Sequence, residues 1–394
     1  MKKISQYFLL LFVFSLPWQG MVFITGVGSI SRLLGFALIG VVILYLLLKR
    51  NAKEPSVLLI VMLLFVLWAA ISYIWTINEA ATVRRIIQNI QLLAMVWLIW
   101  ELCNTQKDYQ MLMQYYILGL FISMFDMILT FFGGAADSYR IAAGAFNPNR
   151  IAVFVAFGIP IAWYLLIKQK DKILFVVNMI FLPLALFTIL LTASRTGIII
   201  GAVGLLIVPL TYFYPKPQVR VVITTFFILL IPISIMYYSE IAERIERNIE
   251  RVSRTPEMIQ EGNLSHRQVI WKAGLESFYK KPITGVGSNA FRYSVVESLG
   301  AAWAAHSTYI AILVETGIPG MLLFLFIFII ALAHMLRLSY VDKVFYLTLL
   351  LTIIIANIPG NLENEKTVWF LFSLFQAYSY MVFRNGKIVI NDRT

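Results

Sequence analysis

The chain has 394 residues, of which 60% are hydrophobic and only 13% are charged. Because soluble domains carry roughly 25% charged residues, this composition excludes an ordinary soluble protein and indicates an integral membrane protein. The formal net charge of +12 has to be located before it is interpreted, since a basic membrane protein can owe its charge to orientation alone. The single cysteine, Cys103, excludes an intramolecular disulfide and a metal site built on cysteines.

Apolar runs long enough to cross a bilayer recur along the whole chain and leave no room for a separate soluble domain. We therefore predict an all-α membrane protein with about twelve transmembrane helices, forming one polytopic domain over residues 1–394. The first run follows two lysines and lacks a small-residue cleavage site, so we predict that it stays as a span. The predicted spans are 5–17, 32–48, 57–75, 86–101, 111–132, 150–167, 172–192, 197–213, 220–238, 307–333, 343–358 and 367–383.

The lysines and arginines between these spans predict the orientation. With the N-terminus on the inner side, the inner segments hold 16 of the 32 basic residues, and the short outer segments hold seven. An excess of positive charge in short loops marks the cytoplasmic side, whereas long loops cross largely regardless of charge. Both termini are therefore expected to be cytoplasmic.

One long outer loop, residues 239–305, lies between the ninth and tenth predicted spans. Isoleucines and arginines recur at helical spacing in its first part, residues 239–257, and glutamates precede several arginines by four positions. These arginines form either a phosphate-binding stripe or, as the pairing favours, the ion pairs of a solvated helix.

The second part of the loop predicts another helix. Ser265 stands three residues before Gln268, as in a capping box. The helix that follows should carry Arg267 and Trp271 on one face and end before Pro282.

The stretch HSTYIAILVETGIPG, residues 306–320, places His306 at the start of an apolar helix and Glu315 nine residues further in. A helix N-terminus disfavours the imidazolium, which keeps the ring neutral and able to accept a proton. We therefore consider His306 a candidate general base. The alternative is an interfacial histidine that only hydrogen-bonds a neighbouring carbonyl. Glu315 is costly inside a bilayer and should face the bundle interior or water.

Three arginines outside the long charged helix have no acidic neighbour at helical spacing. Arg195 follows Ser194 in TASRTG, Arg150 follows the turn Asn-Pro-Asn, and Arg267 opens the loop helix. A guanidinium at the membrane boundary suits a phosphate, which it binds through two parallel hydrogen bonds. The alternative is that these side chains only reach toward lipid headgroups.

No metal or cofactor site is expected. The six aspartates are scattered, and no two form the close acidic pair that a divalent ion on a diphosphate usually requires.

The order of NPNR, SRTG, the loop sequence SHRQVIW and then HSTYIAILVETGIPG resembles the superfamily of bacterial O-antigen ligases and O-antigen polymerases. The resemblance implies transfer of a glycan from undecaprenyl diphosphate onto a sugar hydroxyl, on the periplasmic side of the inner membrane and without a metal ion. Arg195 and Arg267 match the arginines assigned to the diphosphate, and His306 matches the catalytic histidine. Arg150 is a third candidate for the diphosphate, and Glu315, Ser194 and Trp271 are secondary site residues.

On this basis the first choice is the ligase that joins O-antigen to lipid A core. A polymerase that joins lipid-linked repeats, and a protein glycosyltransferase, share the same motifs. The alternative outside the enzymes is a transporter or flippase of lipid-linked sugars. Such a protein would use the same arginines only for binding. The expected partners are the lipid-linked donor, a lipid A core or lipid-linked acceptor, and membrane lipids, without nucleic acid.

Overall fold

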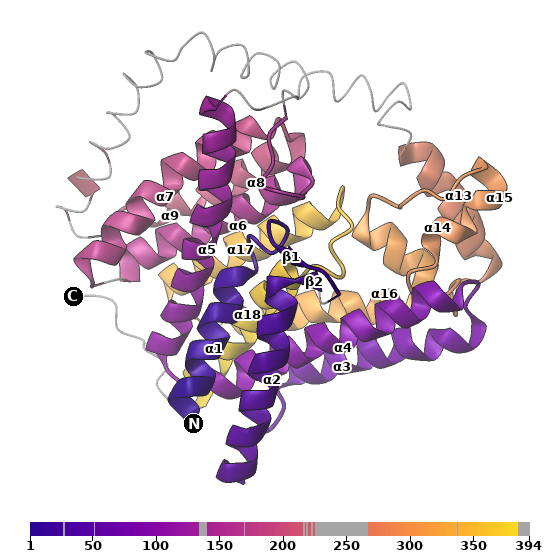
Figure 1. Ribbon diagram of the computed structural model, residues 1–394, viewed down its shortest axis with the longest axis horizontal. Helices are drawn as coiled ribbons and strands as arrows, with labels where there is room; N and C mark the ends of the chain where they lie inside the picture. Colours follow the sequence, from indigo (N-terminus) through magenta and orange to yellow (C-terminus); the bar gives the residue numbers. More distant parts are fainter. Residues whose placement is uncertain are drawn as a thin grey trace.

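The computed structural model describes residues 1–26, 28–50, 52–133, 140–168, 170–215, 217, 220–221, 224, 267–336 and 338–384. The helix predicted over 239–257 and the cap residue Ser265 lie outside these ranges, and so does nearly all of the ninth predicted span. The described chain is almost entirely helical, which confirms the all-α prediction (Figure 1). Its two short strands, β1 (Phe23–Ile24) and β2 (Gly28–Ser29), pair antiparallel in a hairpin that the sequence did not predict.

Helices occupy the positions of eleven predicted spans, while the ninth is not tested. They are α1 (Lys2–Ser15), α2 (Ile30–Lys49), α3 (Val57–Ile71) with the 3-10 turn η1 (Ser72–Trp75), α4 (Glu79–Leu102), α5 (Gln106–Phe132), α6 (Pro148–Lys168), α7 (Lys172–Leu191), α8 (Arg195–Leu205) with α9 (Ile207–Thr211), α16 (Thr308–Met335), α17 (Tyr340–Asn357) and α18 (Lys366–Arg384).

Seven of these helical segments are long and apolar enough to cross a membrane: α2, α3 with η1, α5, α6, α7, α16 and α17. This number defines a multi-pass membrane protein, but it does not establish all twelve spans. The segment α8–α9, Arg195–Thr211, is apolar but shorter than these seven.

Helix α6 forms the centre of the bundle and is buried along nearly its whole length. It packs against α5, α7, α8 and α17, and its apolar side chains join one continuous core. Close packing requires a glycine at Gly158, where a Cβ would lie 2.5 Å from the ring of Phe181 and 2.7 Å from Leu120. The core fixes the ends of α6 and α8, which carry two of the candidate arginines.

A smaller unit lies to one side of the bundle, at the N-terminal end of α16 (Figure 1). It contains α13 (Arg267–Lys280), α14 (Phe291–Ser294) and α15 (Val296–Leu299). Its apolar side chains form a separate core with Ala305, Ala311 and Val314. The described part of the long loop is therefore packed onto the start of α16.

Helix α16 is broken within the sequence Gly-Ile-Pro-Gly. Gly317 adopts φ 66° and ψ −168°, which is not helical. The backbone carbonyl of Ile283 lies 2.2 Å from where a Cβ on Gly317 would be, so only glycine fits. Pro282 accepts a hydrogen bond from the backbone N–H of Ile318 across the break (2.9 Å).

Candidate functional site

Arg195 is held at the start of α8 by a tightly bonded turn. The Ser194 hydroxyl accepts a hydrogen bond from the backbone N–H of Gly197 at 3.1 Å and so caps the helix. The hydroxyl of Thr192 accepts one from the Ser194 N–H at 3.2 Å. Arg140 donates to the carbonyl oxygen of Thr192 at 3.1 Å. Ser194 is thus buried and acts as a helix cap, which positions the guanidinium that follows it.

Gly197 allows α8 to approach α6 closely. A Cβ on Gly197 would lie 2.4 Å from the Cβ of Ala152. Any larger residue would force the two helices apart. The position of Arg195 therefore depends on this contact as well as on its own turn.

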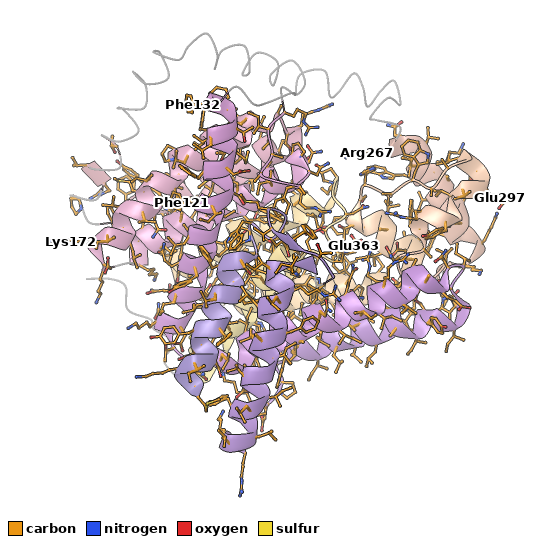
Figure 2. The ribbon with its side chains drawn as sticks, viewed as in Figure 1. Phe121, Phe132, Lys172, Arg267, Glu297 and Glu363 are labelled. Carbon is orange, nitrogen blue, oxygen red and sulfur yellow. The ribbon has the colours of Figure 1, made fainter. Side chains whose placement is uncertain are left out.

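Arg267 is the first described residue of α13 and is partly buried (Figure 2). The helix ends at Lys280, as predicted from Pro282. Further along α13, the indole nitrogen Nε1 of Trp271 donates a hydrogen bond to the carbonyl oxygen of Ala305 at 2.7 Å. Trp271 thus connects the helix that carries Arg267 to the residue next to His306.

His306 lies two residues before the first residue of α16, rather than within its first turn. Ser307 is the N-cap, and Thr308 begins the helix. The backbone of His306 has φ 50°, in the left-handed region, which non-glycine residues seldom adopt. The residue as a whole is exposed to solvent.

Burial, and secondly the positive charge of Arg267, lower the pKa of His306 below its ordinary value of 6.5. The sequence predicted a neutral His306 ring because of the helix N-terminus. In the structure the pKa of His306 is also lowered, but the main causes are burial and Arg267. At neutral pH the imidazole is therefore unprotonated and able to accept a proton.

Arg267 interacts electrostatically with both Arg195 and His306. Burial and the charge of Arg195 lower the pKa of Arg267, and Arg267 in turn acts on His306. Since like charges disfavour each other, the free site carries an electrostatic cost that an anion would remove. The N-terminus of α8 adds positive potential at Arg195. This arrangement suits an anionic group bound beside a neutral base.

Arg150 lies at the start of α6 and is already paired. Its Nη2 lies 3.2 Å from Oε1 of Glu365 in the segment before α18. Asn149, its neighbour, accepts a hydrogen bond of 2.6 Å from Arg140, which also binds the Thr192 carbonyl. Arg150 is therefore close to the turn of Arg195, but its guanidinium is in part neutralised by a carboxylate 215 positions away in sequence.

A polar cavity of about 170 Å³ lies between these elements, lined by Arg150, Glu315, Ala305 and other residues. Glu315 is buried and accepts hydrogen bonds from the backbone N–H groups of Asn289 (2.7 Å) and Phe291 (3.3 Å). The prediction that Glu315 faces a polar interior is thus confirmed. Its contacts fix the loop that follows α13.

Sequence reasoning missed a buried ion pair in the wall of this cavity. Arg85 of α4 lies 3.0 Å from Glu363 and also donates to the side chain of Asn289 at 3.0 Å. In the sequence, this ion pair was indicated only by the two glutamates of NLENEK, between the last two predicted spans. No basic residue that could pair with them was apparent from sequence spacing. Among the described residues, no group of three or more His, Cys, Asp or Glu side chains is placed to hold a metal ion.

The described helices define a multi-pass helical membrane protein, in which Arg267 interacts electrostatically with Arg195 and with His306. Residues 179–325 match the family Wzy_C, described as O-Antigen ligase, and this stretch contains Arg195, Arg267 and His306. The resemblance to O-antigen ligases and polymerases is thereby confirmed, and it supports a glycosyltransferase-type role that uses lipid-linked glycans. No curated protein matches the chain.

Proposed function

We propose that the protein transfers a glycan from undecaprenyl diphosphate to a sugar hydroxyl at the periplasmic face of the inner membrane, with both chain termini in the cytoplasm. The acceptor is proposed to be lipid A core, which makes the protein an O-antigen ligase. The supporting observation is that Arg267 interacts electrostatically with both Arg195 and His306, and that all three residues lie in a stretch that matches the O-Antigen ligase family.

In this mechanism the neutral imidazole of His306 takes the proton from the acceptor hydroxyl. The acceptor oxygen attacks the anomeric carbon of the donor, and the bond from that carbon to the diphosphate oxygen breaks. Arg195 and Arg267 neutralise the charge that develops on the departing diphosphate. Direct attack inverts the anomeric configuration, and no step uses a metal ion.

The test is a transfer reaction with purified protein in vesicles, undecaprenyl diphosphate glycan as donor and EDTA present. His306→Ala should lower the rate by about 10² or more, because a positioned general base contributes roughly 10² to 10⁴. His334→Ala, near the opposite end of α16, is the matched control and should retain the wild-type rate. Equal rates for wild type and His306→Ala would remove this residue from the mechanism.

A polymerase that joins two lipid-linked repeats is the second candidate, because the family match does not separate the two acceptors. Offering lipid A core and a lipid-linked repeat in separate reactions distinguishes them. Product with the repeat alone would assign the polymerase. Movement of the donor across the vesicle without any product would instead identify a transporter.

A further inference from the structure

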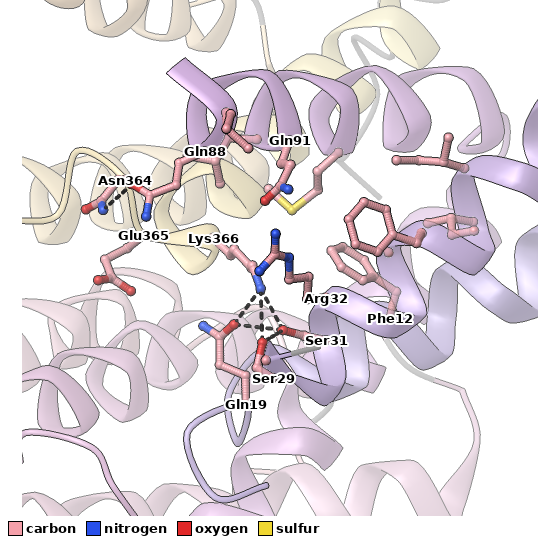
Figure 3. A pocket seen from close by; sticks show the side chains of 18 of the residues that line it. Phe12, Gln19, Ser29, Ser31, Arg32, Gln88, Gln91, Asn364, Glu365 and Lys366 are labelled. Atoms are coloured by element: carbon pink, nitrogen blue, oxygen red, sulfur yellow. Dashed lines mark hydrogen bonds between the residues drawn. The ribbon is translucent and has the colours of Figure 1, made fainter. Parts of the chain in front are cut away.

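A second cavity, of about 480 Å³, lies apart from His306, between α1, α2, α4 and the start of α18 (Figure 3). None of the residues that sequence motifs singled out lines it. Its volume falls in the range of ligand-binding pockets, roughly 300 to 1,000 Å³. The lining is divided into a polar, positively charged end and an apolar wall.

Lys366 is the centre of the polar end. Its ammonium group donates hydrogen bonds to the side chains of Gln19 (2.9 Å), Ser31 (2.7 Å) and Ser29 (3.5 Å), all of which are neutral. In Figure 3 the Arg32 side chain points into the same space. The exposed Arg84 adds a third basic side chain to the lining.

This positive charge is only partly balanced within the cavity wall. Glu365 is the acidic residue of the lining, and its carboxylate pairs with Arg150 at 3.2 Å. Lysine and arginine side chains at a membrane boundary recognise phosphate groups of lipids. The polar end therefore fits a phosphate or another anionic headgroup.

The other part of the cavity is an apolar wall built from three helices. Phe12 of α1, Leu38 of α2, and Leu92, Met95 and Leu98 of α4 line it. Helix α2 is long and apolar enough to cross the membrane, so this wall runs away from the charged end along a membrane helix. A phosphate-binding end joined to an apolar slot matches the chemistry of a lipid with an anionic head.

The charged end is connected to the site of His306 by one short segment, residues 358–365. Asn364 lines both this cavity and the small polar cavity beside Ala305. Within the segment, the carbonyl of Gly360 accepts a hydrogen bond of 2.8 Å from Thr308, and the Leu362 N–H donates one of 2.8 Å back to the same hydroxyl. Thr308 is two residues from His306, so the segment 358–365 links the larger cavity to the residues beside the proposed base.

We propose that this cavity binds the lipid anchor of the glycosyl acceptor, with its phosphate at Lys366, Arg32 and Arg84 and an alkyl chain along α2 and α4. This assignment rests on the proposed function. It places donor and acceptor in different sites, the donor diphosphate at Arg195 and Arg267 and the acceptor lipid on the other side of the segment 358–365.

Two variants and two matched controls test the assignment in the transfer reaction. Arg84→Ala removes an exposed cation from the cavity, and Lys172→Ala removes an exposed cation from the start of α7. Gln91→Trp fills the cavity from α4, whereas Ile90→Trp adds the same ring at the neighbouring exposed position outside it. The acceptors are lipid A core and, in a second series, an undecaprenyl diphosphate-linked repeat.

Arg84→Ala should raise the acceptor KM about tenfold, as expected for losing a charge-assisted hydrogen bond, and leave the donor KM unchanged. Gln91→Trp should raise the acceptor KM by at least as much, while both controls behave as wild type. If these variants raised the donor KM, or left the acceptor KM unchanged while the wild-type protein was active, the assignment of the cavity would be overturned. The proposed function would not be affected by that result.

Native mass spectrometry of the same proteins identifies a retained lipid. Loss of a bound bilayer phospholipid in Gln91→Trp, with an unchanged acceptor KM, would assign the cavity to a structural lipid and overturn the proposal. No transfer by the wild-type protein with either acceptor would contradict the proposed function instead.

Discussion

The indole nitrogen of Trp271 donates a hydrogen bond to the backbone carbonyl of Ala305 at 2.7 Å, and this bond links the helix of Arg267 to the residue before His306. Trp271→Phe keeps the ring and removes the donor. We expect kcat to fall about tenfold, because small misplacements of reacting groups are costly, and stability to fall by about 1 kcal/mol. The matched control is Trp303→Phe, an exposed tryptophan of the same loop. An unchanged kcat in Trp271→Phe would contradict this positioning role.

The pH dependence of transfer should report on His306. Because burial and the charge of Arg267 lower its pKa below 6.5, more than half of the His306 rings are neutral at pH 6.5, and kcat/KM should reach half its plateau below that pH. Arg267 holds the pKa down, so Arg267→Gln favours the imidazolium and should move the acidic limb to higher pH. Rate profiles of both proteins provide the measurement. A limb that stays in place, or moves to lower pH, would argue against His306 as the titrating base.

The two arginines should act on the donor. Arg195→Ala and Arg267→Ala should each lower kcat/KM for the donor by about 10² to 10³, the usual effect of removing one charge-stabilising donor. Lysine at either position should restore part of the loss, since it keeps the charge but not the two parallel bonds. Arg150→Ala is the informative comparison because Glu365 already pairs with this side chain. A comparable loss there would assign Arg150 to the diphosphate, as its sequence context suggested.

The buried pair of Arg85 and Glu363 should be structural. Both side chains are almost fully buried, 7% and 6% exposed, with 3.0 Å between Nη1 and Oε1. Arg85→Met leaves an unpaired buried carboxylate and should cost about 3 to 5 kcal/mol. The double variant Arg85→Met/Glu363→Leu should recover much of this, measured by thermal unfolding in detergent. If the double variant is no more stable than the single one, the pair is not the source of the loss. Lys172→Ala is the exposed control.

The contact of Gly197 with Ala152 should be needed for both stability and activity. Gly197→Val places side-chain atoms where only 2.4 Å separates a Cβ from Ala152, and overpacking of this kind costs roughly 1 to 3 kcal/mol. Gly40→Val is the control, since nothing lies within 4 Å of a Cβ at that position of α2. Thermal unfolding and transfer rates of the two variants should differ clearly. Equal behaviour would show that α8 shifts without displacing Arg195.

Local sequence patterns were sufficient to place most of the helices, and they gave Arg195, Arg267 and His306 as candidate site residues. Apolar runs placed eleven helices because each run reflects burial or lipid exposure of that segment alone. Arg195, Arg267 and His306 were recognisable because each stands in a short motif at a helix start. The break at Gly317 was visible in Gly-Ile-Pro-Gly.

Pairings between distant segments were not predictable in the same way. Arg150 meets Glu365, and Arg85 meets Glu363, across more than 200 positions of sequence. No periodicity within one element reports such a contact. The same reason explains why the cavity around Lys366 was not foreseen, since it is assembled from side chains of four separate helices.

The break at Gly317 divides α16 into two parts with different attachments. In the part before the break, Val314 and Glu315 accept backbone hydrogen bonds from Val286 and Gly287 of the loop, at 3.0 and 2.9 Å. Beyond the break, after the bond from Ile318 to Pro282, no backbone bond to that loop is found among the described residues. The turn of helix that follows His306 is therefore anchored to the same unit as Arg267. His306 and Arg267 therefore share one support, whereas Arg195 lies on α8 of the bundle.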